Sequence, residues 1–268
     1  MRETLREAKH TLMPPRDDPH GPLSPLLIVL TVVTGLVDAL SYLELGRVFV
    51  ANMTGNVVFT GFALAGAPGL SVSASLAALA AFLVGAAGGG RLGAGFGDRR
   101  LRLLWVGCAL QAVLIAAALT VAAAVSGLGT GARYSLILLL GLAMGLQNAV
   151  ARRLAVPDLT TTVLSQTLTG LAADLRRFGG PGSRAGRRML SAFAMALGAF
   201  TGATLVLHVH ILVAFAAPLI LLFGAAVAGY VLDRRAGPAA SADPAPAPDD
   251  AAPDTGSGPL VAPDGKNI

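Results

Sequence analysis

Residues 35–61 read GLVDALSYLELGRVFVANMTGNVVFTG, and the rest of the chain is best understood from this stretch. An apolar helix carrying Asp38 leads into a polar corner at residues 44–47, and a polar break at residues 52–56 precedes a second apolar run. Hydrocarbon offers no water to a carboxylate or to an unpaired backbone group, so both features are costly inside a membrane. We therefore expect this stretch to form half of a polar site in an integral membrane protein.

The composition supports a membrane protein. Of 268 residues, 54% are hydrophobic and 13% are charged, whereas soluble domains carry about 25% charged residues. The mean hydropathy is +0.68. The net charge of +5 comes from basic residues in loops beside apolar runs, without aromatic platforms, which argues against nucleic acid and for a lipid bilayer as the partner. The single Cys108 offers no disulfide or metal framework, and we expect neither a metal nor a cofactor.

Six apolar runs have the length of about 20 residues that a membrane-spanning helix needs. They are residues 23–43, 73–92, 102–126, 133–151, 188–208 and 211–232. Residues 48–66 and 157–174 are apolar but interrupted by polar residues. The transmembrane domain is thus expected over 23–233. Residues 1–22, which contain four prolines, and residues 234–268 are expected to be disordered cytoplasmic segments.

The arginine clusters predict the topology. They lie in the leader and then near residues 91–102, 152–153, 176–188 and 234–235. The positive-inside rule places all of them in the cytoplasm, together with both termini. If residues 48–66 crossed the membrane, the cluster at 91–102 would lie outside. Both interrupted segments are therefore expected to be re-entrant, the first entering from outside and the second from inside.

This topology divides the chain into two inverted units of three spans each, at about 23–126 and 133–232. Three short matches between the units agree with it: GLVDA at 35–39 with GLQNA at 145–149, TGNV at 54–57 with TTTV at 160–163, and Gly85 and Gly89 with Gly198 and Gly202. The expected fold is all-α, with six transmembrane helices and two re-entrant half-helices in an inverted 3+3 repeat.

Broken helices that meet near the membrane centre direct free backbone N–H groups at a bound solute. The candidate substrate-binding residues are Asp38, Asn52, Thr54, Gly55, Asn56, Gln147, Asn148, Thr160, Thr161 and Thr162. They favour a small polar or anionic solute. The alternative is that the threonines and asparagines only cap short packing helices.

Asp38 has two compatible interpretations. An intramembrane carboxylate commonly serves as a cation or proton site. It can also accept hydrogen bonds from the Thr54-Gly55-Asn56 backbone and so hold the corner. Its counterpart in the second unit, Asn148, is neutral. Gln111 is expected to serve packing.

The strings GLVDA at 35–39 and VFVANMTGN at 48–56, with Thr161 and Gly170, resemble the YoaK-like family of bacterial inner-membrane proteins, whose function is unknown. The resemblance covers about residues 23–233. It implies a multi-pass protein of the bacterial inner membrane and carries over no catalytic residue.

These observations predict a small-solute transporter or channel. The alternative is a membrane scaffold or sensor that uses the basic loops at 91–102 and 174–188 to recruit lipid or a cytoplasmic partner. An enzyme is not expected, because Asp38 has no evident catalytic partner. A homo-oligomer stays open, since Gly85-to-Gly89 and Gly198-to-Gly202 spacings can join helices within a chain or between chains.

Overall fold

The computed structural model describes residues 2–15, 18, 21–97, 99–125, 127–156, 169 and 185–236. Within these residues the chain forms eight helices and no strand: α1 (Arg2–Leu12), α2 (Leu23–Glu44), α3 (Met53–Leu64), α4 (Val72–Phe96), α5 (Arg100–Ala124), α6 (Thr130–Leu154), α8 (Ala185–His208) and α9 (Ile211–Ala236). The all-α fold class is confirmed for the part of the chain that is described.

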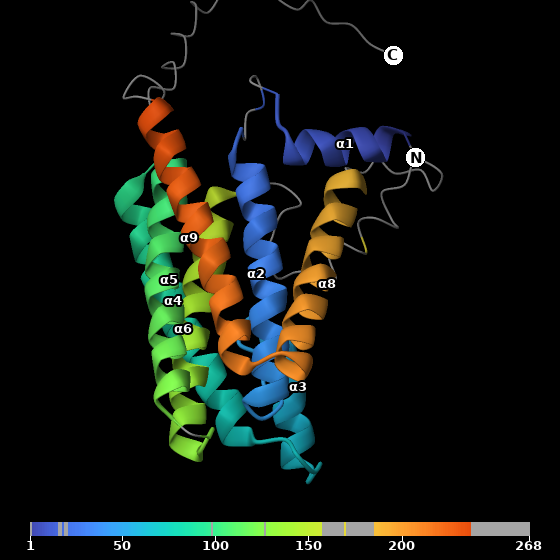
Figure 1. Cartoon of the computed structure of the whole chain (residues 1–268), viewed down its shortest axis with the longest axis vertical. Coiled ribbons are helices and arrows are strands. Elements are labelled where there is room, and N and C mark those ends of the chain that lie inside the picture. The colour runs from blue at the N-terminus through green and yellow to red at the C-terminus, as the bar shows by residue number, and fades with distance from the viewer. Residues whose placement is uncertain are drawn as a thin grey trace, which may run out of the picture.

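Six of the helices are long and apolar enough to cross a membrane: α2, α4, α5, α6, α8 and α9. Their ends agree with the six predicted spans to within about one helical turn. Figure 1 shows them as a single bundle in which successive spans run in opposite directions. The predicted set of six spans is confirmed.

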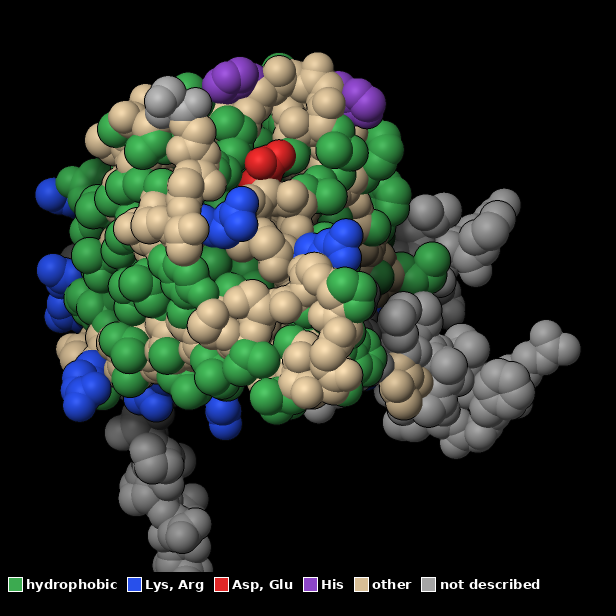
Figure 2. All heavy atoms as spheres, turned by 90° about the horizontal axis from the view of Figure 1, so that it is seen from below, with side chains coloured by type: hydrophobic (Ala, Val, Ile, Leu, Met, Phe, Trp, Pro, Cys, Tyr) green, Lys and Arg blue, Asp and Glu red, His purple; other side chains and the backbone are tan. Residues whose placement is uncertain are grey.

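The two ends of the bundle differ in charge. Figure 1 shows that α2 begins at the end where α9 finishes, and that α4, α6 and α9 end there while α5 and α8 begin. Arginine residues collect at these helix ends: Arg99, Arg100, Arg102, Arg152, Arg153, Arg187, Arg188, Arg234 and Arg235. We call this the basic end. Figure 2 shows the opposite face, where charged side chains are sparse near the centre.

Helix α1 lies across the basic end and contacts α8 (Figure 1). The leader therefore differs from the disordered segment expected there, at least over Arg2–Leu12. All four prolines of the leader lie after Leu12, so none interrupts the helix. The Glu7 carboxylate accepts a hydrogen bond of 2.9 Å from the backbone N–H of Gly186, at the first turn of α8. This bond satisfies one of the free N–H groups of a helix N-terminus.

Helix α2 packs against α8 with almost no side chain between the two backbones. A Cβ atom at Gly35 would overlap the carbonyl oxygen of Met195, and one at Gly198 would overlap that of Val32. Helices α4 and α6 pack in the same manner, as described below. Glycine at these positions lets the backbones approach, which is how helices associate in lipid.

Helix α3 has 12 residues, a length of about 18 Å, and cannot cross a hydrocarbon core of about 30 Å. The preceding residues 45–52 are not helical, so the interruption predicted within 48–66 is present. Helix α3 contacts α4. The second interrupted segment, 157–174, lies outside the described residues except for Thr169.

Candidate functional site

Asp38 lies on α2, 5% exposed, and holds the loop that follows this helix. Its Oδ1 atom accepts hydrogen bonds from the backbone N–H of Val50 at 3.2 Å and of Ala51 at 2.8 Å. Its Oδ2 atom is buried and has no hydrogen-bond partner in the described part of the chain. The expected bond from Asp38 to the break is present in kind, but it reaches Val50 and Ala51 instead of Thr54, Gly55 and Asn56.

Asn56 holds the same loop from the other side. Its side chain is 1% exposed and pairs with one residue: Oδ1 accepts from the Phe49 N–H at 2.9 Å, and Nδ2 donates to the Phe49 carbonyl at 2.5 Å. This pairing satisfies both backbone groups of Phe49 as a neighbouring strand would do. The amide of Asn56 is therefore occupied within the protein and does not point to a solute.

Gly55 leaves room for the Phe49 ring. A Cβ at Gly55 would lie 2.8 Å from Cδ2 of Phe49. The same ring stacks on Tyr42 of α2 and Phe59 of α3, with centroid distances of 5.0 and 5.7 Å. The string from Phe49 to Asn56 thus forms a compact unit, which we call the corner, between the end of α2 and the start of α3.

Asn52 and Thr54 occupy the first residues of α3. Asn52 is the N-cap residue, yet its side chain makes no capping hydrogen bond. Thr54 is exposed. The simple capping explanation therefore does not account for Asn52, and the free N–H groups at the start of α3 lie next to the Asp38 carboxylate.

Gln147 belongs to a second polar cluster, which we call the central network. Its Nε2 atom donates to Thr34 Oγ1 at 2.8 Å and to the Leu30 carbonyl at 3.2 Å. Its Oε1 atom accepts from Gln111 Nε2 at 2.7 Å. Thr34, Gln111 and Gln147 are all buried, and they join α2, α5 and α6.

Two members of the central network were not among the predicted site residues. Gln111 was assigned to packing, and its bond to Gln147 shows that it also joins two helices. Thr34 was not singled out, although it lies four residues before Asp38 and so on the same side of α2. A polar residue one turn from an intramembrane carboxylate was the signal that could have found it.

The remaining predicted site residues are not brought into either group in a way that can be described fully. Asn148 is half-buried, and its Nδ2 donates to the Met144 carbonyl of its own helix at 2.9 Å. Thr160, Thr161 and Thr162 lie outside the described residues. The structure thus places Asp38 and Asn56 in the corner and Gln147 in the central network.

Six long apolar helices with buried polar side chains define the class: this chain is a polytopic α-helical membrane protein, in contact with lipid along its spans. Residues 26–231 match the family described as "Protein of unknown function (DUF1275)". The chain belongs to this family.

A curated relative is similar over part of the chain. It is the UPF0700 transmembrane protein YoaK of Bacillus subtilis (strain 168), 34% identical over 152 residues, which are 56% of this chain and 66% of that protein. The match thus spans just under two thirds of the relative. The resemblance to YoaK-like proteins is confirmed, and a multi-pass location in keeping with a bacterial inner membrane agrees with it. No solved structure matches the chain significantly.

Proposed function

We propose that this protein is a small-solute transporter built from two inverted halves, α2–α5 and a second half that contains α6, α8 and α9. The observation that carries the proposal is that the glycine contacts of one helix pair recur in the other. Gly35 of α2 meets the carbonyl of Met195 on α8, and Gly145 of α6 meets the carbonyl of Phe82 on α4.

The recurrence follows constant spacings in the sequence. An offset of 110 residues relates Gly35 to Gly145, and an offset of 113 relates Phe82 to Met195. Independent contacts obey the same two offsets. Gly198 meets Val32, and Gly85, 113 residues earlier, meets Leu142, 110 residues later.

A third pair of contacts agrees. A Cβ at Gly202 would lie 2.7 Å from the carbonyl oxygen of Leu36, and one at Gly89 would lie 2.9 Å from that of Leu146. Since α2 and α6 run in opposite directions, as do α4 and α8, the relation between the halves is an inversion (Figure 1). Inverted repeats that exchange helices in this way are common in transporters, where the halves move against each other.

The corner supports the same function. Helix α3 starts within the bundle next to Asp38 and is too short to cross, which fits a re-entrant half-helix. The Asp38 carboxylate occupies the amides of Val50 and Ala51 that a solute anion would need. We therefore favour a neutral polar solute over an anionic one, with the central network at the interface between the halves as its binding region.

The orientation follows from the arginines. The basic end is proposed to face the cytoplasm, because Lys and Arg are retained there during insertion. Both termini would then be cytoplasmic, and α3 would enter from outside. A catalytic role is not proposed.

Cysteine accessibility tests the transporter in membranes that carry the Cys108→Ala background. Thr54→Cys probes the start of α3, because Thr54 is exposed while Asn56 is buried. Gln147→Cys probes the central network, and Val113→Cys, on the lipid-facing surface, is the matched control. A transporter predicts reaction of the first two with small, membrane-impermeant thiol reagents and no reaction of the third. If Gln147→Cys is as inert as the control, no aqueous path reaches the centre and the proposal fails.

The alternative function, a scaffold or sensor at the membrane surface, is favoured by one observation. Helix α1 lies on the basic end and is held to α8 through Glu7 and Gly186. Replacing Arg91, Arg99 and Arg102 by glutamine distinguishes the two. A scaffold loses its cellular activity, whereas a transporter that still inserts keeps its accessibility pattern.

A further inference from the structure

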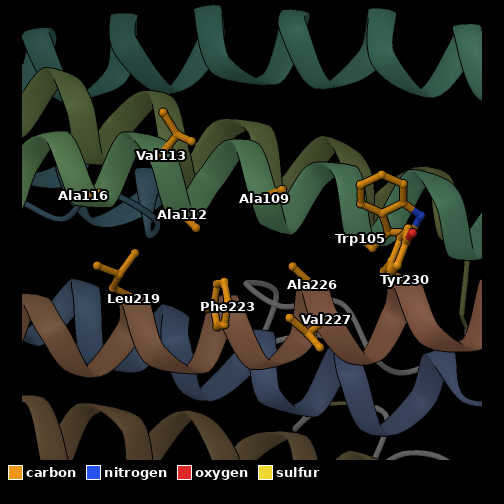
Figure 3. Close-up of a pocket in the computed structure, with 10 residues that line it drawn as sticks. All are labelled: Trp105, Ala109, Ala112, Val113, Ala116, Leu219, Phe223, Ala226, Val227 and Tyr230. Atoms are coloured by element: carbon orange, nitrogen blue, oxygen red, sulfur yellow. The ribbon is translucent and has the colours of Figure 1, made fainter.

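Helices α5 and α9 leave an apolar groove with a volume of about 440 Å³. Figure 3 shows Trp105 and Tyr230 at one end of it and Leu219 near the other. The helices touch near the aromatic end, where a Cβ at Gly229 would lie 2.9 Å from Cβ of Trp105. Farther along, α5 contributes alanines at 109, 112 and 116, whose small side chains hollow its surface.

The groove opens to the surroundings of the bundle. Val113 and Phe223, which line it, are 66% and 67% exposed. Both lie within membrane-spanning helices, so this exposure is to hydrocarbon. From Trp105 to Ala116 the groove follows α5 for about 16 Å, roughly along the direction of the lipid chains.

The aromatic end of the groove lies toward the basic end of the bundle. The Trp105 and Tyr230 rings meet edge to face, with centroids 5.4 Å apart. The indole N–H of Trp105 donates to Asp233 Oδ2 at 3.2 Å, and the Arg234 guanidinium lies 5.2 Å from the Tyr230 ring centroid. Tryptophan and tyrosine prefer the level of lipid headgroups, so the groove begins at this interface and runs into the membrane.

We propose that this groove binds one acyl chain of an anionic phospholipid from the leaflet at the basic end, with the lipid phosphate near Arg234. The inference is independent of the proposed transport function. The Asp233 carboxylate is engaged by the Trp105 N–H, and Arg102, Arg234 and Arg235 outnumber it at this level. The local charge therefore attracts an anion.

The same charges disfavour a second copy of the chain as the occupant. In a two-fold dimer within one membrane, the copies share their orientation, so the arginines of both would meet at the same depth. Like charges brought together in this way oppose association. A lipid phosphate neutralises them instead.

Trp105 is the only tryptophan in the chain, so its fluorescence reports occupancy of the groove. The full-length protein is reconstituted in phosphatidylcholine bilayers that contain a small fraction of lipid with brominated acyl chains, which quench tryptophan on contact. We expect brominated phosphatidylglycerol to quench about fivefold more effectively than brominated phosphatidylcholine at the same mole fraction, the effect of about one arginine–lipid interaction. Equal quenching by the two lipids overturns the proposal, because it shows ordinary bilayer lipid only.

Variants separate the charge from the groove. Arg234→Gln is expected to reduce the preference for phosphatidylglycerol to near one, while Arg91→Gln, on α4 and away from the groove, keeps it. Ala112→Phe is expected to lower quenching by both lipids, and the milder Ala109→Leu serves if that variant does not fold. Unchanged quenching in a folded groove variant overturns the site. So does disulfide dimerisation of Val113→Cys, in the Cys108→Ala background, together with weak quenching, which assigns the groove to a second copy.

Discussion

The helix pairs α2–α8 and α4–α6 pack alike but carry different polar groups. Gly35 and Gly145 each meet a carbonyl oxygen of the partner helix. Just beyond them, α2 has Val37-Asp38 and α6 has Gln147-Asn148. Asp38 turns to the loop that follows its own helix, whereas Gln147 turns to the centre of the bundle and reaches Thr34.

The difference teaches which features of such a bundle can vary. Two backbones in contact leave no space for a methyl group, so the glycines are constrained in both pairs. A buried polar side chain needs only a partner for its donors and acceptors, and that partner can lie in different places. One pair therefore stabilises the corner and the other stabilises the interface between helices.

Alanine at the contact glycines tests the shared part of this comparison and should have the largest effect. Gly35→Ala and Gly145→Ala each place a methyl group against a backbone carbonyl, which cannot move as a flexible side chain does. We expect each to lower the free energy of unfolding by about 3 kcal/mol or more, measured by denaturation in detergent micelles. Gly88→Ala, with open space around it, is the control and should be neutral or slightly stabilising. Tolerance of one substitution and not the other would show that the pairs are not equivalent.

Removal of the Asp38 side chain tests the corner and comes next. Asp38→Ala leaves the buried N–H groups of Val50 and Ala51 without an acceptor, at a cost of about 2–4 kcal/mol. Asp38→Asn retains a carbonyl oxygen and should cost about half as much. Hydrogen exchange of residues 48–52 should accelerate most in Asp38→Ala. A corner as protected as in the unmodified protein would mean that Asp38 serves a solute or proton rather than the loop.

Asn56→Asp changes one atom of the corner. It places an oxygen opposite the Phe49 carbonyl in place of the Nδ2 donor. We expect a loss of about 2 kcal/mol in stability, measured by thermal unfolding. Thr54→Ala, two residues away and exposed, should change stability by less than about 0.5 kcal/mol. If the two variants are equally stable, the Asn56–Phe49 pairing does not hold the loop.

A double-mutant cycle on the central network should give the smallest effect. Gln111→Leu and Gln147→Leu each leave the partner amide with an unmet hydrogen bond. The double variant removes both amides of the pair, so we expect a coupling energy of about 1 kcal/mol in unfolding experiments. Strictly additive losses would show that the two glutamines act independently.

Much of the fold follows from the sequence because the bilayer imposes simple rules. Length and hydropathy located the six spans, and the arginines grouped their ends. Asp38, Gly55 and Asn56 stood out as polar or small residues within an apolar stretch, and the structure places all three at the corner. Their partners were not predictable, because a carboxylate can accept from any nearby N–H group. The helix α1 was also missed, since its stability depends on contact with α8 as well as on its own residues.

The sequence by itself determined that this is a six-span helical membrane protein with a polar break after its first span, because the cost of polar groups in hydrocarbon acts residue by residue. Only the tertiary structure decided that α2 packs on α8 and α4 on α6, that Asn56 pairs with Phe49, and that Gln147 joins Thr34 to Gln111. The reason is that hydrogen-bond partners and backbone contacts depend on which helices become neighbours, and a linear pattern of hydropathy carries no information about neighbours.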